Sequence, residues 1–252
     1  MQWKTVLAAL AGIAVTATGI HAEYETLNLF GAIGGGFGMG GIRYESRKVE
    51  NGNTSVTDQF FNYGSGFKFD IGCQYFMMEN VALQPSFSYS VGTPFKVEDI
   101  NALQTTDTTF SRHLFGIKLQ VVPRFEVLDL ISMYTGVGIG LYWNARPFKI
   151  VSESGTGGTS VTQEATGKIT SKPALGFLAQ LGTDYPLNDK LTLFGEIGVE
   201  QISFSLDKYT VKKPVSATTY YSKDDSNTDN LDPQKVPGSN FQIRLGVRYA
   251  IK

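Results

Sequence analysis

The sequence predicts an all-β protein, a transmembrane up-and-down antiparallel β-barrel of eight strands. Three observations predict it: apolar and polar residues alternate along eight segments, the connections between these segments alternate in length, and aromatic residues collect near the segment ends. Successive side chains of a strand point to opposite faces, so strict alternation gives one apolar and one polar face. In a membrane barrel the apolar face meets lipid and the polar face lines the interior.

The alternation is clearest in the C-terminal segment, where every odd position from Phe241 to Ile251 is apolar or aromatic and Arg244 and Arg248 lie between them. Seven earlier segments have the same odd phase. In chain order, their apolar positions are Leu27, Leu29, Ile33, Phe37 and Met39; Phe67, Phe69, Ile71, Cys73 and Tyr75; Val81, Leu83, Pro85, Phe87, Tyr89 and Val91; Phe115, Ile117, Leu119 and Val121; Met133, Val137, Ile139, Leu141 and Trp143; Leu175, Phe177, Ala179, Leu181 and Tyr185; and Leu191, Leu193, Ile197 and Val199.

The connections alternate between short and long. The three short ones are 77–80, 124–129 and 186–190, and the four long ones are 45–63, 93–112, 145–172 and 205–240. A barrel with both termini in the periplasm requires this parity, with short periplasmic turns and long extracellular loops. Residues 149–151 and 160–165 could extend two strands as a hairpin beyond the membrane. A ten-stranded barrel would result if part of 205–221 paired as an extra hairpin.

Aromatic residues on the predicted lipid face fall into two groups, as expected for girdles at the two membrane interfaces. The outer girdle is predicted to contain Phe67, Tyr89, Phe115, Trp143 and Phe241, and the periplasmic girdle Tyr75, Phe125, Tyr185 and Tyr249.

The N-terminus predicts export. Lys4 precedes an apolar, Ala-rich core, and Ala22 ends a cleavage site, so residues 1–22 are predicted to be a Sec-type signal peptide and residues 23–252 the barrel domain. A retained anchor is the alternative. The formal net charge of −1 argues against nucleic acid as a partner. Cys73 is the single cysteine, which excludes an internal disulfide and a cysteine-based metal site.

This pattern resembles the small eight-stranded outer-membrane barrels of the OmpA/OmpX type over essentially the whole mature chain. The resemblance implies the outer membrane of a Gram-negative bacterium, contact with outer-membrane lipid and lipopolysaccharide, and recognition by the outer-membrane insertion machinery. In that class the last strand usually ends in an aromatic residue; here Tyr249 and Ile251 keep the register and Lys252 follows. We expect no peptidoglycan-binding domain after the barrel.

Charged residues occupy even positions and are therefore predicted to face the barrel interior. They are Lys68, Asp70, Lys118, Glu196, Glu200, Arg244 and Arg248. Because the last two strands are neighbours, the two glutamates could meet the two arginines. Side chains fill the interior of an eight-stranded barrel, and charges there must be paired or hydrated. A closed, structural charge network is therefore predicted; the alternative is a narrow gated channel for ions or small solutes.

Two motifs resemble ligand sites without meeting their requirements. Residues 36–41 match GxGxxG, but no helix follows them, so dinucleotide binding is not predicted. Residues 225–229 resemble the start of a calcium loop, but Asn230 and Val236 occupy the positions of the required glycine and bidentate glutamate. The sequence therefore predicts no cofactor and no metal.

An enzymatic alternative rests on Ser111 and His113, which share a strand face. The order is reversed relative to the His-x-Ser of lipid A deacylases, and no carboxylate lies nearby in the sequence, so a lipid A-modifying enzyme is the second alternative only. The prediction is a non-enzymatic barrel with a structural or surface-recognition role through its long loops. Exposed tyrosines of the last loop, Tyr209, Tyr220 and Tyr221, could contact an extracellular protein or ligand.

Overall fold

The computed structural model describes residues 27–50, 53–100, 104–128, 131–156, 159–212 and 235–251. The predicted signal peptide and the calcium-like segment 225–229 lie outside these ranges. The strands are β1 (Leu27–Gly38), β2 (Ile42–Glu50), β3 (Asn53–Phe61), β4 (Gly66–Met78), β5 (Val81–Ile100), β6 (Gln104–Leu128), β7 (Ile131–Thr156), β8 (Thr159–Ser171), β9 (Ala174–Pro186), β10 (Leu191–Lys212), β11 (Lys235–Pro237) and β12 (Asn240–Ile251). In the ranges described, there is no helix of the length and apolarity needed to cross a membrane.

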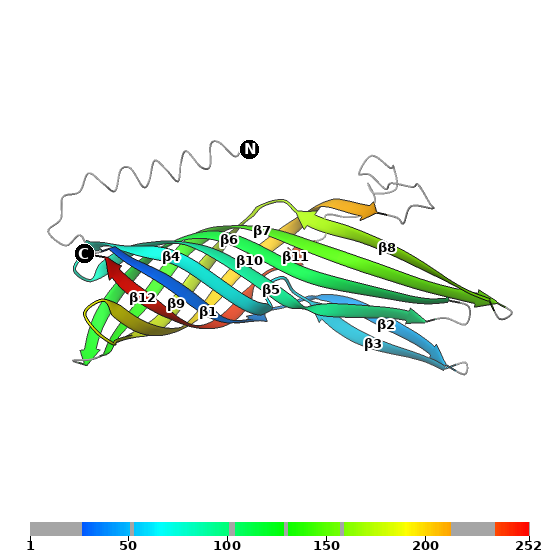
Figure 1. Ribbon diagram of the computed structural model, residues 1–252, viewed down its shortest axis with the longest axis horizontal. Helices are drawn as coiled ribbons and strands as arrows, with labels where there is room; N and C mark the ends of the chain where they lie inside the picture. The colour runs from blue at the N-terminus through cyan, green and yellow to red at the C-terminus, as the bar shows by residue number, and fades with distance from the viewer. Residues whose placement is uncertain are drawn as a thin grey trace.

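Eight of the strands close into a ring, in the order β1, β4, β5, β6, β7, β9, β10 and β12, and every neighbouring pair is antiparallel. The closing pair joins β1 to β12 in a continuous register from Leu27↔Ile251 to Gly38↔Asn240. Figure 1 shows these strands crossing one another obliquely at the left of the molecule. The predicted class, an all-β antiparallel membrane-type barrel, is confirmed.

The two faces of the ring differ as the alternation predicts. On the outer face, Leu245 is 66% exposed and Phe177 62% exposed, whereas on the inner face Asp70 is 0% exposed. Every strand of the ring contributes exposed Ile, Leu, Val or Phe residues to this face. An apolar surface of this extent is far larger than a soluble monomer displays. This outer face belongs in lipid, and the fold is that of an outer-membrane barrel.

The predicted girdle residues lie on the outward face of the ring, and several of them pair with other apolar residues on neighbouring strands. At the outer level, Phe37 is opposite Phe241, and Phe115 is opposite both Tyr89 and Trp143. At the other end, Tyr249 pairs with Leu29 and Leu191, Tyr75 with Leu27, Tyr185 with Leu193, and Phe125 with Met133.

The short connections occupy one end of the ring. β4 and β5 are separated by 79–80, β6 and β7 by 129–130, and β9 and β10 by 187–190. Backbone hydrogen bonds link these turns to neighbouring strands, with Arg124 N donating to Asn80 O at 2.7 Å and Ala250 N to Lys190 O at 2.8 Å. Each turn is shorter than predicted because the strands run farther than the apolar alternation indicates.

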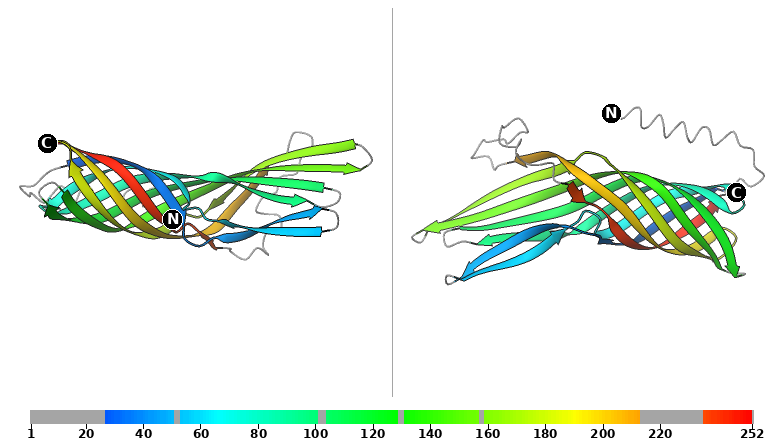
Figure 2. Two further views of the ribbon diagram at one scale, coloured as in Figure 1. Left: turned by 90° about the horizontal axis from the view of Figure 1, so that it is seen from below. Right: turned by 180° about the vertical axis from the view of Figure 1, so that it is seen from behind.

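The long connections lie at the other end of the ring, and three of the four segments contain β-hairpins. β2 and β3 pair from Ile42↔Phe61 to Glu50↔Asn53. β5 and β6 stay paired as far as Ile100↔Thr105, and β7 and β8 as far as Thr156↔Thr159. The hairpin expected from 149–151 and 160–165 is therefore present. Figure 2 shows the three hairpins as arms that project from the barrel.

The alternation did not indicate the other two hairpins, for a physical reason. Outside the bilayer neither strand face has to be apolar, so threonine-rich stretches such as the start of β6 form strands without the period of two. Residues 206–212, part of the segment proposed for an extra barrel hairpin, continue β10 and pair with β8. They therefore lengthen an existing strand above the ring of eight; residues 213–234 lie outside the described ranges.

Candidate functional site

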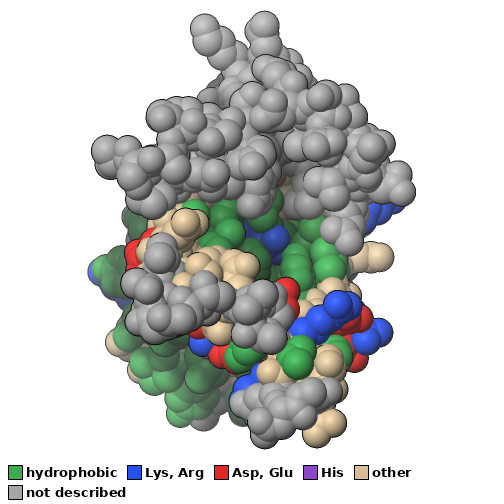
Figure 3. Space-filling view, turned by 90° about the vertical axis from the view of Figure 1, so that its right-hand side faces the viewer, with side chains coloured by type: hydrophobic (Ala, Val, Ile, Leu, Met, Phe, Trp, Pro, Cys, Tyr) green, Lys and Arg blue, Asp and Glu red, His purple; other side chains and the backbone are tan. Residues whose placement is uncertain are grey.

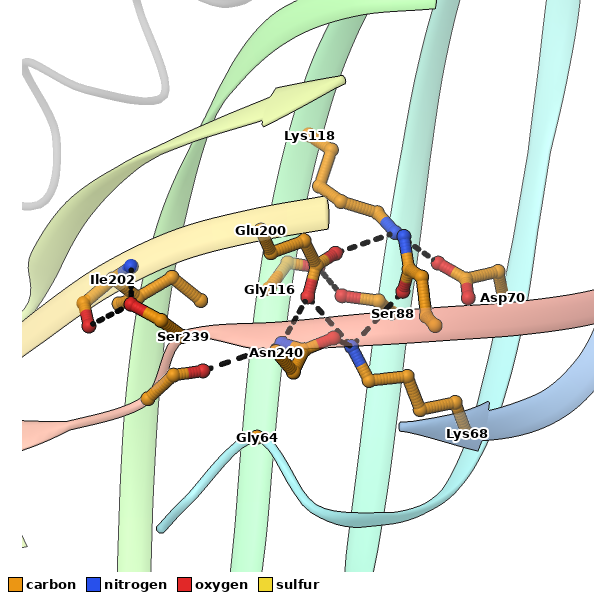
Figure 4. A network of polar contacts seen from close by, with 12 residues as sticks. Gly64, Lys68, Asp70, Ser88, Gly116, Lys118, Glu200, Ile202, Ser239 and Asn240 are labelled. Atoms are coloured by element: carbon orange, nitrogen blue, oxygen red, sulfur yellow. Dashed lines mark hydrogen bonds and ion pairs between the residues drawn. The ribbon is translucent and has the colours of Figure 1, made fainter. Parts of the chain in front are cut away.

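The middle of the lumen holds a closed network of opposite charges. Three cations, Lys68, Lys118 and Arg244, alternate with three carboxylates, Asp70, Glu196 and Glu200. β4, β6, β10 and β12 carry these residues at even positions, so all of their side chains point inward. Figure 4 shows four of them converging with Asn240.

Glu200 lies between the two lysines. Its Oε2 accepts from Lys68 Nζ at 2.6 Å, and its Oε1 lies 3.4 Å from Lys118 Nζ. Lys68 Nζ also donates to Asn240 Oδ1 at 2.7 Å and to Gln242 Oε1 at 3.0 Å. Lys118 in addition forms an ion pair with Asp70. The two lysines therefore have carboxylate partners contributed by strands on different sides of the ring.

Arg244 joins the remaining carboxylates. Its Nη1 lies 2.8 Å from Asp70 Oδ2, and its Nη2 forms an ion pair with Glu196. Tyr134 donates its hydroxyl proton to Glu196 Oε2 at 2.9 Å. Removing one member of such a network would leave a buried charge uncompensated, which costs several kcal/mol.

Arg248 does not join this network and pairs with Asp184 of β9. Asp184 Oδ2 also lies 3.0 Å from Arg124 Nη2. The predicted contact between Arg248 and a glutamate of β10 is therefore wrong. In the register of β10 and β12, Arg248 lies opposite Thr192, four residues before Glu196 and nearer the short turns.

Two clusters of buried hydrophobic residues lie on either side of the charged network. The cluster toward the short turns consists of Phe30, Ala32, Phe76, Ala82, Val122, Tyr134 and Phe194. The cluster toward the hairpins consists of Phe61, Tyr63, Leu114, Tyr142, Ala174, Ile202, Phe204 and Val236. Buried arginines lie against the rings of both clusters, Arg248 on Phe194 and Arg146 on Phe61, so apolar and charged side chains fill the described lumen together.

The end of β3 and the start of its connection to β4 fold into the outer mouth; we call residues 61–64, all of which are buried, the plug. The Asn62 amide nitrogen donates to the carbonyl oxygens of Met39, Gly40 and Ser239 at 2.8 to 3.2 Å. Tyr63 N donates to Pro237 O at 3.1 Å. The plug thus connects β1, β4 and the approach to β12 across the mouth.

Aromatic packing holds the hairpins on the plug. Tyr44 of β2 contacts Phe61, Phe95 of β5 and Phe110 of β6 at centroid distances of 5.6 to 6.2 Å, and Phe110 also contacts Phe148 of β7 at 6.2 Å. We call this set, Tyr44, Phe61, Phe95, Phe110 and Phe148, the aromatic cluster. The aromatic cluster packs the bases of the hairpins against the barrel, so the hairpins have a defined position relative to it.

The proposed Ser111–His113 pair does not form a catalytic arrangement in the described contacts. Nδ1 of His113 shares a hydrogen bond of 2.8 Å with the Tyr89 hydroxyl, and the two rings are stacked. His113 and Tyr89 both lie on the outward face at the outer girdle. His113 is thus positioned as an interfacial residue.

Sequence analysis missed three buried charges, Asp184, Arg112 and Arg146, and the partly buried Arg124. Asp184 occupies an even position in a strand that was recognised, so its phase could have identified it. The three arginines fall in or beside segments predicted as connections. Their strands continue past the membrane, where the apolar alternation that would have located them is lost.

No protein-family model and no curated protein matches the sequence. Similarity to solved structures is weak but covers most of the chain. A major outer membrane protein from Thermus thermophilus aligns with 89% of this chain and 99% of that chain, at 12% identity and a TM-score of 0.48. The outer membrane protein OprG from Pseudomonas aeruginosa aligns with 90% of this chain and 96% of that chain, at 10% identity and a TM-score of 0.43. Neisserial surface protein A aligns with 89% of this chain and 95% of that chain, at 11% identity and a TM-score of 0.42. Such values say nothing about what this chain binds.

Proposed function

We propose that this protein is a non-enzymatic barrel of a Gram-negative outer membrane, with a closed lumen, that displays its three hairpins for recognition at the cell surface. The observation that carries the proposal is a contrast between two regions: side chains fill the lumen, whereas three packed hairpins extend beyond the barrel. The strands β6 and β7 have 25 and 26 residues, whereas a membrane crossing needs about 9–11. More than half of each strand is therefore available outside the bilayer.

The packing of the arms supports a binding role. Loops that carry recognition are placed by a rigid scaffold, and here the aromatic cluster fixes the base of the arms on the plug. The arms also carry charges of both signs at exposed positions, such as Arg43 with Asp58 and Lys149 with Glu164. Mixed charge of this kind suits specific contact with a partner more than general attraction to an anionic surface.

Surface display can be tested with single cysteines. In a Cys73→Ser background, Thr54→Cys and Glu153→Cys place a thiol on two arms, and Asp189→Cys places one in a short turn. We expect a membrane-impermeant maleimide to label the two arm variants on intact cells and the turn variant only after the envelope is opened. Labelling of the turn variant alone on intact cells would contradict the proposed orientation.

Recognition is tested separately, by applying the purified protein to a glycan array. The control is a variant with shortened arms, in which 47–56, 97–107 and 151–164 are each replaced by a tight turn. Retention by specific glycans that disappears with the arms supports the proposal. Equal retention of both proteins would place binding elsewhere, and no retention of either would count against a glycan partner.

A further inference from the structure

Two buried arginines face each other at the outer mouth without a carboxylate. The pairs Phe110↔Phe148 and His113↔Ala145 set the register of β6 and β7, and this register places Arg112 directly opposite Arg146. Both side chains point inward and are more than nine-tenths buried. Like charges directly opposite on paired strands are destabilising. Within the described ranges, no Asp or Glu forms an ion pair with either of them.

Both guanidinium groups flank one ring of the plug. The Cζ atom of Arg112 lies 5.5 Å from the Phe61 centroid, and that of Arg146 lies 4.7 Å from it. Arg146 also stacks on Phe110, at 4.5 Å, and on Tyr44, at 5.6 Å. Stacking occupies the faces of a guanidinium, and the N–H groups at its edge stay available for the planar oxygens of a carboxylate or phosphate.

The existing hydrogen bonds of the two arginines leave part of each edge free. Arg112 Nη1 donates to Asn62 O at 2.8 Å, and Nη2 lies 3.3 Å from Thr93 O. Arg146 Nη1 donates to the Tyr44 hydroxyl oxygen at 2.8 Å. The Nε atoms of both arginines are buried and have no partner among the described residues. Burial lowers the pKa of Arg112, and no carboxylate offsets this effect.

A further buried side chain on this part of β7 has polar atoms without a described partner. Asn144 is 5% exposed, and neither its Oδ1 nor its Nδ2 has a hydrogen-bond partner among the described residues, whereas the buried hydroxyl groups of Tyr63 and Ser171 interact with each other. Asn144 is two residues from Arg146 on the same face of β7, and Ser171 follows Thr170, the partner of Ala145. In native proteins most buried polar groups are paired, so the unpaired donors Asn144 Nδ2, Arg112 Nε and Arg146 Nε together indicate a ligand.

The chain also makes room for this arrangement. Gly92 of β5 pairs with Arg112, and a Cβ atom at this position would lie 2.2 Å from Arg112 Nε. Seen from the hairpin end, the molecule is hollowed between the arms, and hydrophobic and basic side chains lie in the hollow (Figure 3). A ligand could therefore approach from outside the cell.

The geometry points to an oxyanion-binding site at the outer mouth, formed by Arg112 and Arg146 and completed by the amide nitrogen of Asn144. Its ligand is a carboxylate, sulfate or phosphate group, held by charge-assisted hydrogen bonds from the guanidinium edges. Both arginines face the interior and not the lipid, so the expected source is a soluble anion. The site is independent of recognition by the hairpin arms, because it needs no arm beyond the aromatic cluster.

Calorimetric titration of the full-length protein, refolded in a non-ionic detergent, tests the site with inorganic phosphate, sulfate and acetate as probes. Sodium chloride at matched ionic strength is the reference. We expect saturable binding of at least one oxyanion and a rise in the unfolding temperature that chloride does not produce, because a ligand that binds only the folded state stabilises it. No heat and no temperature rise with any of the three would overturn the proposal.

Variants locate the site. Arg146→Gln should weaken binding by about tenfold or more, the effect expected for one lost charge-assisted hydrogen bond. Gly92→Ala should also weaken binding, because the added Cβ atom would displace the Arg112 guanidinium group. Arg146→Lys, which keeps the charge but not the planar fork, should lose less than Arg146→Gln. Arg43→Gln, on an exposed hairpin, should bind as the wild type does. Equal affinity in all of these variants would overturn the assignment, and the heat-induced shift in SDS electrophoresis verifies that each one is folded.

A final titration distinguishes a soluble oxyanion from a lipid headgroup as the ligand. The same protein is titrated with a phosphate-bearing lipid in mixed micelles, with and without saturating inorganic phosphate. Binding of the free anion that the lipid does not displace supports a soluble ligand. Binding of the lipid alone, sensitive to Arg146→Gln, would contradict the soluble source and assign the arginines to a headgroup.

Discussion

The middle of the lumen and its outer mouth contain buried charge in opposite arrangements. In the middle, Lys68, Lys118 and Arg244 each contact at least one carboxylate, and the network connects strands on different sides of the ring. At the mouth, Arg112 and Arg146 lie opposite each other among aromatic rings. The comparison teaches that a buried arginine with carboxylate partners stabilises the closed barrel, whereas a buried arginine without such partners is available to a ligand.

The largest expected effect comes from breaking the paired network. Asp70→Asn leaves Lys118 and Arg244 short of a buried counter-charge, and we expect the free energy of unfolding to fall by about 3–5 kcal/mol. Denaturant unfolding of the protein in lipid vesicles measures it. The control is Asp58→Asn, which breaks the exposed pair with Arg43 and should cost about 1 kcal/mol or less. Similar losses in both variants would mean that the lumen network contributes no more than a surface ion pair.

The next effect tests where the lipid lies. Leu245→Arg puts a charge on the outward face near the middle of β12, which should cost about 2–4 kcal/mol in a bilayer. Phe37→Arg, at the level of the outer girdle, should cost about 0–1 kcal/mol. The same unfolding measurement compares the two variants. Equal losses of stability in the two variants would contradict a bilayer whose midplane lies at the level of Leu245.

Neutralising a mouth arginine should have a smaller effect than breaking the lumen network. Arg112→Gln removes hydrogen bonds to Asn62 and Thr93 but also relieves the repulsion from Arg146, so the net change should be about 1 kcal/mol or less. Unfolding in an anion-poor buffer measures this change. A loss as large as that of Asp70→Asn would show that Arg112 has a buried counter-charge, and the comparison between mouth and lumen would fail.

The smallest effect is expected on the arms. The side chains of Lys149 and Glu164 are about half exposed on the paired strands β7 and β8, and Lys149 Nζ lies 2.9 Å from Glu164 Oε1. Lys149→Ala should change the free energy of unfolding by about 0.5 kcal/mol or less. A larger change, measured in the same way, would mean that the arms contribute to barrel stability through more than the aromatic cluster.

Much of the fold follows from the sequence because lipid imposes an apolar residue at every second position. That constraint locates the outward Phe67 or Leu245 and, by phase, the inward Lys68 and Arg244. It ends at the membrane surface, and for that reason the continuation of β6 and β7 to Arg112 and Arg146 went unpredicted. The choice of partner, such as Asp184 for Arg248, depends on the register and on how side chains meet across the lumen, neither of which the alternation specifies.

The closed lumen is the central claim, and single-channel recording in a planar lipid bilayer tests it most directly. Because paired charges and hydrophobic clusters fill the lumen, the wild-type protein should insert without producing stepwise conductance. A steady conductance that falls when Glu196 or Arg244 is replaced would contradict the claim and identify the network as an ion path.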